Sequence, residues 1–503
     1  MMCSTYNAQT TLPYNESFTS GNMPPGIITP SRSGVNNSTS FTILGAELTE
    51  AVNNQFGTII LDNYTFNNSN GLQIEFEYVM YEGTASPADG ISVFLYDANE
   101  PASVGYHGRG LGYAYNRSGI KGVRGGYLMV GFDQLGNSKK QGDVNEIVQG
   151  MVGTFGGRNM VVIRGGYNKD GLDDDEKYFY GYPVLATQST SFKKIQDTQN
   201  PAGKRLNYIS GAYDETNYNI EDAVFNIRGG AYFNSETNRG YRKAYIVLKP
   251  MSGGGFYITV RIKGNDTGTV YTRTVYENLP YPITMNYPEN AGVIPAGIDG
   301  NSYNVQALNT LPPSLFKIGF SASTGTLNQR HIIKNLTVSL PFMSDVVEDF
   351  AKYCYTTAIF KYVSIFPFQN DVLYKGAISD DSTPIGGNTI DIIDYNSFRF
   401  QEDNNIIAPT SSNPYNGNLL EVSIPDEGTW VYNKINGEVR FTPKRGFIGV
   451  AKIDYTIKGF GDSTLDGPFG QELYRSSPKS ISVQVFECGG VVNPNIQNKV
   501  LRI

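Results

Sequence analysis

The sequence predicts an all-β protein with two β-sandwich domains, and three observations lead to this expectation. The chain has 503 residues, more than a single hydrophobic core usually accommodates. Glycine (56), tyrosine (35) and phenylalanine (27) are abundant while methionine (10) is scarce, a composition that favours strands and tight turns over helices. Hydrophobic residues make up 40% and charged residues 17%, which indicates packed cores rather than a disordered chain.

Individual strands are marked by alternating apolar and polar residues. The run 72–80 (LQIEFEYVM) alternates as a half-buried strand does, and 91–96, 128–132 and 160–163 are similar. The segment 345–357 (DVVEDFAKYCYTT) suggests a short helix and lies where the character of the chain changes. We therefore expect a domain boundary near Met343, with a residual leader at 1–9, domains at 10–343 and 344–490, and a tail at 491–503.

Charge and cysteine content exclude several classes of partner. A net charge of −7 gives no attraction for a polyanion, so nucleic acid is not expected as a partner. The sequence has no run of about 18 apolar residues, so no membrane insertion is expected. Two histidines and no Cys-x-x-Cys pair argue against a structural zinc site. Cys354 and Cys488 fall in the same predicted domain, and both a disulfide and two free thiols fit the sequence.

Two segments offer polar groups to a ligand at the ends of strands. Asp89 and Gly90 precede the strand 91–96, and a carboxylate at a sheet rim can accept hydrogen bonds from vicinal hydroxyls. In the segment 105–113 (GYHGRGLGY), alternating glycines let the backbone approach a ligand and offer amide donors. Taken singly, an Asp-Gly pair is also typical of a turn, and the glycine-rich segment also fits a flexible hairpin.

A third segment has the oxygen ligands that calcium prefers. Asp133, the carbonyl of Leu135 and Asn137 alternate after the strand 128–132, and Asp143 can close the cage. A strand that ends in a polar turn is the alternative interpretation. A fourth segment, 316–327, reads as a strand followed by a short polar loop, and another strand follows at 332–338.

Together these four segments resemble the L-type (legume-like) lectin family, in its bacterial branch, over about residues 10–342. The resemblance implies a concanavalin-like jelly-roll sandwich that binds glycans and has no enzymatic activity. It implies that Asp89 accepts sugar hydroxyls and that the glycine loop donates a backbone amide. It also implies that Asn137 contacts both metal and sugar, and that a specificity loop precedes His331. The implied carbohydrate-binding residues are Asp89, Gly108, Arg109, Gly110, Asn137, Gly325, Thr326 and Leu327, and the implied metal ligands are Asp133, Leu135, Asn137 and Asp143.

The chain departs from the plant members of this family at three points. Gly131 stands where they carry a glutamate, and no histidine follows Asp143 nearby, so we expect one Ca²⁺ site and no transition metal. Leu135 stands where they often carry an aromatic ring that stacks on the sugar. Tyr106, Tyr113 and Tyr127 are the candidates to replace that ring.

The C-terminal domain resembles the immunoglobulin-like repeats of bacterial fibrillar adhesins. The matching residues are 437–449 (GEVRFTPKRGFIG) and 453–457 (IDYTI), and the single tryptophan, Trp430, is expected in the core of a second β-sandwich. Residues 6–9 (YNAQ) look like the end of a secretory leader, although the charged start and apolar run of a leader are absent.

These resemblances predict a secreted or cell-surface bacterial protein, an adhesin head that binds cell-surface glycans or polysaccharide and is displayed in several copies. The alternatives are a phage virion fibre that recognises a host, and a structural surface protein with a decayed sugar site. A glycoside hydrolase is the enzyme class to exclude. Such enzymes need two carboxylates about 5–10 Å apart, and the sequence has no Glu-x-Asp-x-x-Glu run to supply them.

Overall fold

The chain forms two compact units, Met1–Pro341 (unit 1) and Phe342–Ile503 (unit 2). They meet close to the boundary expected near Met343, and the finer domain ranges stay a prediction. The computed structural model describes residues 9–32, 35–116, 119–138, 159–170, 177–190, 205–206, 213–214, 225–251, 253–288, 305–341, 346–355, 361–369, 371, 395–402, 405–408, 411–412, 417–458, 475–476 and 478–488.

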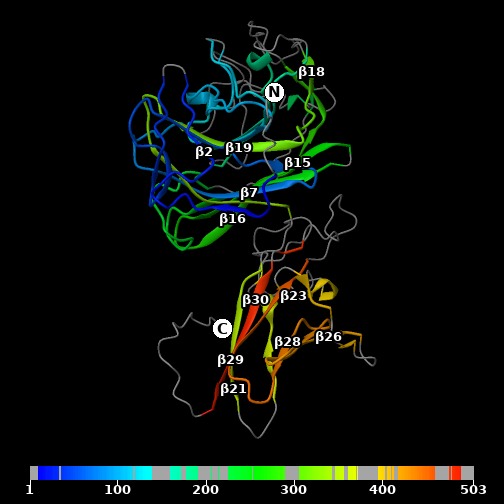
Figure 1. Cartoon of the computed structure of the whole chain (residues 1–503). Coiled ribbons are helices and arrows are strands. Elements are labelled where there is room, and N and C mark those ends of the chain that lie inside the picture. The colour runs from blue at the N-terminus through cyan, green and yellow to red at the C-terminus, as the bar shows by residue number, and fades with distance from the viewer. Residues whose placement is uncertain are drawn as a thin grey trace, which may run out of the picture. The chain divides into compact units, whose positions relative to one another are not determined.

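Unit 1 is a sandwich of two antiparallel eight-stranded sheets (Figure 1). Sheet I has the order β16-β15-β14-β7-β20-β4-β3, with β1 paired to β20. Sheet II has the order β11-β10-β9-β8-β19-β5-β2, with β6 paired to β19. The strands of sheet I are β1 (Tyr14–Glu16), β3 (Ser40–Thr42), β4 (Gly45–Thr49), β7 (Leu72–Tyr81), β14 (Arg242–Pro250), β15 (Gly255–Asn265), β16 (Val270–Pro282) and β20 (Arg330–Ser339). Those of sheet II are β2 (Ile27–Ile28), β5 (Phe56–Leu61), β6 (Phe66–Asn67), β8 (Gly90–Asp97), β9 (Gly126–Asp133), β10 (Met160–Arg164), β11 (Val184–Ser189) and β19 (Leu315–Ser323).

Two small hairpins complete the strands of unit 1. They are β12 (Arg205–Leu206) with β13 (Tyr213–Asp214), and β17 (Thr284–Pro288) with β18 (Val305–Asn309). Over the described ranges the only helical elements of unit 1 are the 3₁₀ turns η1 (Gly108–Gly110) and η2 (Lys177–Phe179). The all-β prediction is therefore confirmed, and none of the described helices is long and apolar enough to cross a membrane.

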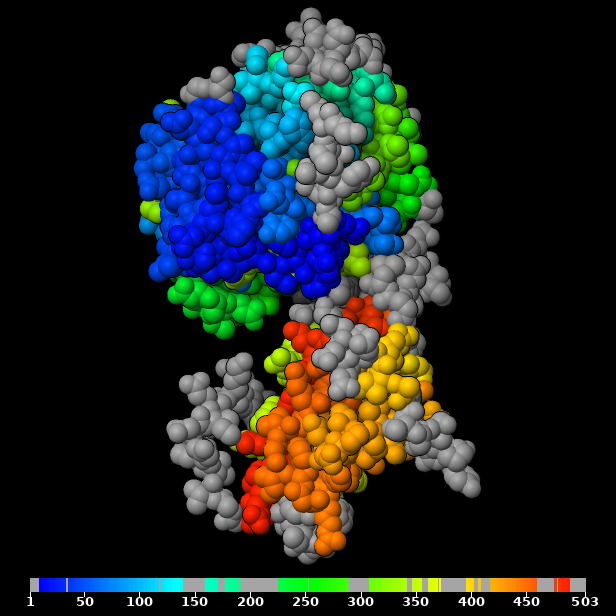
Figure 2. All heavy atoms as spheres, in the orientation of Figure 1, coloured from blue at the N-terminus to red at the C-terminus, as the bar shows by residue number. Residues whose placement is uncertain are grey.

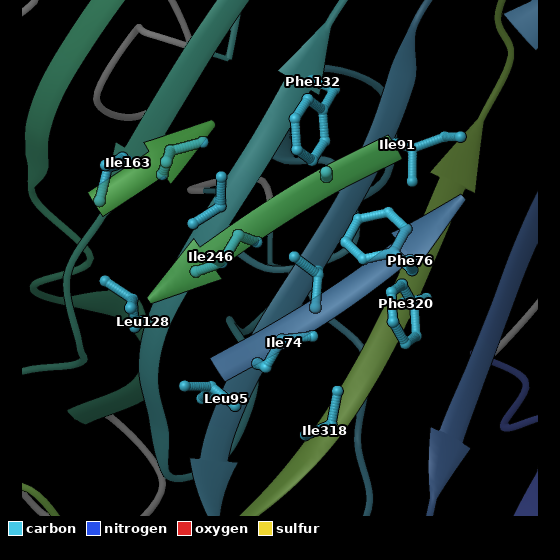
Figure 3. Packing of buried hydrophobic residues seen from close by; sticks show 14 of the residues in the cluster. Ile74, Phe76, Ile91, Leu95, Leu128, Phe132, Ile163, Ile246, Ile318 and Phe320 are labelled. Atoms are coloured by element: carbon cyan, nitrogen blue, oxygen red, sulfur yellow. The ribbon is translucent and has the colours of Figure 1, made fainter. Parts of the chain in front are cut away.

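The alternation in the sequence explains how the two sheets pack. On β7, Ile74 and Phe76 face the interior, and they meet side chains of sheet II such as Phe132 and Phe320 (Figure 3). The ring of Phe76 lies edge-on to both, with centroids 5.9 Å from Phe132 and 5.0 Å from Phe320. Aromatic pairs in this geometry stabilise a core beyond the area they bury. The strands predicted at 72–80, 91–96, 128–132 and 160–163 are all confirmed.

Unit 2 contains two five-stranded sheets, in the orders β21-β30-β29-β23-β24 and β22-β28-β27-β26-β25. Trp430 is fully buried between them and lies 4.4 Å, centroid to centroid, from Phe441, so its predicted core position is confirmed. The elements are β21 (Asp349–Tyr355), β22 (Val363–Ile365), η3 (Pro367–Gln369), η5 (Tyr395–Ser397), β23 (Arg399–Glu402), β24 (Asn405–Ile406), β25 (Ser411–Ser412), β26 (Leu419–Ile424), β27 (Gly428–Asn433), β28 (Val439–Pro443), β29 (Gly449–Thr456) and β30 (Lys479–Glu487).

The helix suggested at 345–357 is wrong, because β21 occupies seven residues of that segment, Asp349–Tyr355, and pairs in parallel with β30. Ala351 and Tyr353 pack against the core of unit 2, while Phe350 and Lys352 are exposed, which is the two-residue period of a strand. Cys354 forms a disulfide with Cys488, which resolves the choice that the sequence left open.

Candidate functional site

Three neighbouring strands of sheet II, β9, β8 and β19, have a terminus on the same side of the sheet. This row of strand termini, called the rim below, carries the first predicted site residues. Gly90, the first residue of β8, pairs with Asp133 on β9 and with Ser323 on β19. Asp89 directly precedes Gly90, so its carboxylate lies where these three strands meet. The peptide bond between Ala88 and Asp89 is cis.

The hydroxyl of Ser323 joins the rim to the glycine loop. It donates a hydrogen bond of 3.0 Å to Oδ2 of Asp89 and accepts one of 2.8 Å from the backbone N–H of Gly108. The backbone N–H of Asp89 in turn donates to the carbonyl of Ser323 at 2.9 Å. One side chain therefore fixes the relative positions of two predicted sugar-binding segments that are distant in sequence.

Glycines explain why the loop 105–114 can lie flat on sheet II. A Cβ atom on Gly112 would lie 2.1 Å from Oγ of Ser321, and one on Gly131 would lie 2.8 Å from Cδ1 of Leu111. The hydroxyl of Ser92 also donates to the carbonyl of Leu111 at 2.6 Å. Gly131 thus makes room for the apolar side chain of Leu111.

The predicted metal loop folds back onto the carboxylate of Asp133. Its Oδ1 accepts a hydrogen bond of 2.7 Å from the N–H of Gly136, and its Oδ2 accepts one of 2.5 Å from the N–H of Ser138. The N–H of Gln134 donates to the carbonyl of Asp89 at 2.8 Å. The residues from 133 to 138 are therefore anchored at the rim beside Asp89.

Asn137 supplies the observation that fits a cation at this loop. Its Oδ1 is shielded from solvent and accepts no hydrogen bond from the described residues, which is unusual for a buried polar atom. Calcium would satisfy such an oxygen. Leu135, whose carbonyl is another predicted ligand, is only half-buried. Asp143 lies outside the described residues. Within the described part of the chain, no group of three His, Cys, Asp or Glu side chains could hold a metal ion by themselves.

Two acidic side chains share the rim, and their environment perturbs Asp89. Asp89 is 6% exposed and Asp133 is fully buried. Burial raises the pKa of Asp89 to about 7, the charge of Asp133 adds to this rise, and the hydrogen bond from Ser323 opposes it. A buried carboxylate beside a like charge is less stable in its ionised form, and a nearby cation would favour that form.

The predicted specificity loop continues β19 beyond Ser323 and so also lies at the rim. The carbonyl of Gly325 accepts a hydrogen bond of 3.1 Å from the N–H of Asn54, and the N–H of Gly325 donates to the carbonyl of Leu327 at 3.0 Å. Thr326 is exposed, and a Cβ on Gly325 would meet no atom within 4 Å. The loop therefore has open space beside it.

Among the three tyrosines considered as stacking rings, only Tyr106 is partly exposed. Tyr113 is fully buried and Tyr127 is 2% exposed, so neither presents a face to a ligand. Tyr106 lies against η1, because a Cβ on Gly110 would be 3.0 Å from the Cβ of Tyr106. Arg109, the middle residue of η1, is half-buried.

His331 does not lie at the rim of sheet II. It is fully buried on β20 of sheet I, where it pairs with Met80, and its Nδ1 is 2.6 Å from Oγ1 of Thr49. Burial lowers the pKa of His331 to about 3, and the charge of Arg228 adds to this effect. The histidine that follows the specificity loop is therefore part of the interior.

Two residues that hold the site together are not evident from the sequence. The sequence marks Ser323 only as part of a strand, although it connects Asp89 to the glycine loop. Arg164 is 1% exposed, and its Nη1 donates to the carbonyl of Ser138 at 2.8 Å. The sequence offers one signal for Arg164, which is a charged residue at the end of the apolar run 160–163. It offers no signal for the distant loop whose carbonyl Arg164 contacts.

Comparisons with known proteins find similar solved structures but no matching family model and no matching curated protein. Lectin I-B4 from Griffonia simplicifolia is 14% identical and covers 65% of this chain and 99% of its own, with a TM-score of 0.32. The exoplasmic/lumenal domain of VIP36, bound to Ca²⁺ and Man3GlcNAc, is 13% identical and covers 63% of this chain and 84% of its own, with a TM-score of 0.31. A lectin from Bauhinia forficata in complex with GalNAc is 14% identical and covers 65% of this chain and 97% of its own, with a TM-score of 0.30. Similarity at this level says nothing about the site residues of this chain.

Proposed function

We propose that unit 1 binds carbohydrate at the rim of sheet II. The observation that carries this proposal is the hydroxyl of Ser323, which joins the carboxylate of Asp89 to the backbone of Gly108. Asp89 would accept hydrogen bonds from two sugar hydroxyls, the backbone around Arg109 and Gly110 would donate to ring or hydroxyl oxygens, and the carboxamide of Asn137 would do both.

The specificity loop (Gly325, Thr326 and Leu327) would decide which sugar fits, because it borders the rim and has open space beside it. Hydrogen bonds to a sugar replace hydrogen bonds to water, so each contributes only about 0.5–1.5 kcal/mol. A single site is then expected to bind in the range of roughly millimolar to tens of micromolar. Adhesion through such sites requires several copies on one surface.

Calcium is proposed as the cofactor at the loop 133–138. Asp133, the carbonyl of Leu135, Asn137 and Asp143 would hold it, and water would complete the six to eight oxygens that calcium takes. The ion would supply positive charge that stabilises the ionised acidic side chains and fixes the carboxamide of Asn137 before a sugar arrives. No transition metal is proposed, because Leu111 fills the space beside Gly131.

Binding without hydrolysis is the proposed outcome. A glycosidase needs one carboxylate that reaches the sugar as nucleophile or base and a second that acts as acid. Asp133 is fully buried, and its two oxygens accept backbone hydrogen bonds from Gly136 and Ser138. Asp89 thus has no accessible carboxylate partner on the neighbouring strand.

Unit 2 is proposed to be an immunoglobulin-like module that displays the binding head of a secreted or cell-surface adhesin. Its two five-stranded sheets with a buried tryptophan are compatible with such a module. The alternative with the same binding function is a phage virion fibre that recognises a host glycan. The genes neighbouring this one would distinguish an adhesin from a virion fibre.

A glycan array tests the proposal directly. The full chain is applied in calcium buffer and again in EDTA, with reducing-sugar release from the same glycans measured in parallel. Binding of a defined set of glycans that EDTA weakens is expected, without sugar release. No binding in either buffer would overturn the proposal and favour a structural surface protein, and sugar release would favour an enzyme.

A further inference from the structure

The row of strand termini that forms the rim continues past β19 to β5. Phe56, the first residue of β5, pairs with Ser323, which also pairs with Gly90. Residues 50–55 connect β4 to β5 and therefore reach the sheet at the rim, and we call them the entry loop. They have no role in the function proposed so far. In Figure 2 the N-terminal segments of unit 1 (blue) form much of the visible surface and border the chain near residue 110 (cyan).

The entry loop follows the specificity loop along the rim. The strands β8, β19 and β5 are neighbours in this order, and Asp89, Thr324 and Gln55 are their respective flanking residues. The N–H of Asp89 donates to the carbonyl of Ser323, and the N–H of Thr324 donates to the carbonyl of Gln55, both at 2.9 Å. Neighbouring strands lie about 4.8 Å apart, so two steps place the entry loop about 10 Å from Asp89. Two linked sugar rings span such a distance, whereas one ring does not.

The hydroxyl of Thr324 ties the entry loop to the start of the specificity loop. It donates a hydrogen bond of 2.6 Å to the carbonyl of Val52 and accepts one of 2.9 Å from the N–H of Gln55. Thr324 is 2% exposed, so water does not compete for these bonds. The N–H of Asn54 also donates to the carbonyl of Gly325 at 3.1 Å. The entry loop is therefore held in one position beside the specificity loop.

Other contacts hold the end of the specificity loop at Asn328. Its side-chain Nδ2 donates to Oδ1 of Asn53 in the entry loop. Its backbone N–H donates to Oγ1 of Thr84 at 3.2 Å, and its carbonyl accepts from the N–H of Thr84 at 3.1 Å. Because both ends of the specificity loop are tied to neighbouring segments, the surface that they form together exists before a ligand arrives.

The entry loop presents an apolar side chain and two amides to the solvent. Val52 is 49% exposed, and Asn53 and Asn54 are also exposed. Gly325 lies between this loop and Asp89 in the order of the strands, and a Cβ added to it would meet no atom within 4 Å. The surface from Asp89 to Val52 is therefore not blocked by a side chain at Gly325.

We infer that the entry loop is a second sugar subsite, so that unit 1 prefers an oligosaccharide of at least two residues to a single sugar. This inference rests on the proposed carbohydrate-binding function and names the size class of the glycan. One sugar would occupy the rim at Asp89, and the next would pass over Gly325 and place its C–H face on Val52. The amides of Asn53 and Asn54 would exchange hydrogen bonds with its hydroxyls, since an amide both donates and accepts.

The charge of the entry loop indicates a neutral second sugar. Glu50 is the single charged residue in the sequence 50–55, and it is exposed. Its backbone N–H donates to Oε1 of Gln55 at 2.6 Å, so it belongs to the same folded loop. A uronic acid or a sulfated sugar beside Glu50 would be repelled, whereas a neutral sugar would not.

The test compares sugars of increasing length on the full chain in calcium buffer. The free monosaccharide that terminates each glycan bound on the array is compared with the neutral disaccharide and trisaccharide that contain it, by calorimetry. The wild type should bind at least one disaccharide about five- to tenfold more tightly than its monosaccharide, the gain from covering one exposed valine and forming one or two hydrogen bonds. Added salt should leave this ratio unchanged, because the second sugar carries no charge.

The variant Val52→Ser removes the apolar contact. It should lower the ratio of disaccharide to monosaccharide affinity to about twofold or less, while the affinity for the monosaccharide stays that of the wild type. Val450→Ser is the matched control, because Val450 is 54% exposed on β29 of unit 2, and the ratio should not change.

A pair of variants at Thr324 tests whether the position of the entry loop matters. Thr324→Val removes the hydroxyl that binds the carbonyl of Val52 and should lower the same ratio. Thr324→Ser keeps the hydroxyl and should retain the ratio of the wild type. Melting temperatures establish that each variant folds.

Four results bear on the inference. Equal affinity of the wild type for monosaccharides and their extended forms would exclude a second subsite and leave the proposed function intact. An unchanged ratio in Val52→Ser would also overturn the inference, because the second sugar would then lie elsewhere. Equal loss of both affinities in Val52→Ser would assign the entry loop a purely structural role. Failure of the wild type to bind any glycan would remove the proposed function and this inference together.

Discussion

The hydroxyl of Ser323 donates a hydrogen bond to the carboxylate of Asp89, and these two residues are 234 positions apart in the chain. They meet because β8 and β19 are neighbours in sheet II and Gly90 pairs with Ser323. The same hydroxyl accepts from Gly108, so one small side chain joins the carboxylate of Asp89 to the glycine loop.

Replacing that hydroxyl tests its role. Ser323→Ala should weaken glycan binding by about tenfold, because a hydrogen bond to a charged group contributes about 1.5–3 kcal/mol and its loss frees the glycine loop. The measurement is glycan affinity by calorimetry. Ser482→Ala on β30 makes the same chemical change in unit 2 and should have no effect. Equal affinities for Ser323→Ala and wild type would show that the link does not matter for binding.

Asp89 is the residue on which sugar recognition should depend most. Asp89→Ala is expected to abolish detectable glycan binding, because the hydroxyls of the sugar lose their main acceptor. The fold should persist, since the carboxylate is buried beside Asp133 and its ionised form is disfavoured there. Asp97→Ala, at the other end of β8, is the control. Retained binding in Asp89→Ala would contradict the site assignment.

Removal of calcium should destabilise unit 1. A ligand that binds only the folded state at about one hundred times its Kd contributes about 2.7 kcal/mol, so EDTA is expected to lower the Tm by several degrees. Calcium should restore the Tm better than magnesium, which demands stricter geometry. In Asn137→Ala the EDTA effect should shrink. An unchanged Tm in EDTA for the wild type would remove calcium from the proposal.

The glycine loop should not tolerate a side chain where it contacts the sheet. Gly112→Ala is expected to cost about 1–3 kcal/mol of stability and to weaken glycan binding, because its Cβ would overlap Oγ of Ser321 and its φ is +74°. Gly325→Ala, where the added carbon meets no atom within 4 Å, is the matched control for stability and should leave it unchanged. The measurement is chemical denaturation, and similar stability of the two variants would argue against close packing of the loop.

His331 should make stability depend on pH. Its pKa is about 3 in the folded protein and 6.5 as the ordinary value, so below pH 6.5 the unfolded chain takes up a proton that the folded chain does not. The stabilising effect of the neutral imidazole is complete above pH 6.5 and falls by about 1.4 kcal/mol per pH unit as the pH decreases toward 3. His331→Asn cannot titrate and should flatten this part of the profile. The same slope in the variant and the wild type would assign the dependence to other groups.

Local patterns in the sequence were sufficient for the strands but not for the contacts between them. The alternation in 72–80 reveals β7, and the Asp-Gly pair correctly marks the start of β8. Ser323 carries no local signal, because its importance comes from the pairing of strands that are far apart in sequence. The exposure of Tyr106, Tyr113 and Tyr127 was equally unpredictable, since a loop folding over sheet II decides it.

The segment 345–357 shows how tertiary pairing overrides local preference. Its composition suggests a helix, yet a parallel partner strand and an inward-facing Tyr353 make it a strand instead. Sequence alone also left open whether Cys354 and Cys488 are joined, because a disulfide requires that their strands be neighbours.

That disulfide has a mechanical consequence for unit 2. The strands β21 and β30 run in parallel near the two ends of the unit, so tension applied to those ends would pull the strands past each other and load their hydrogen bonds together. Because Cys354 is bonded to Cys488, the pull would pass through the sulfur bridge and bypass the 133 residues between them. Stretching would therefore leave most of this unit folded for as long as the bridge is oxidised.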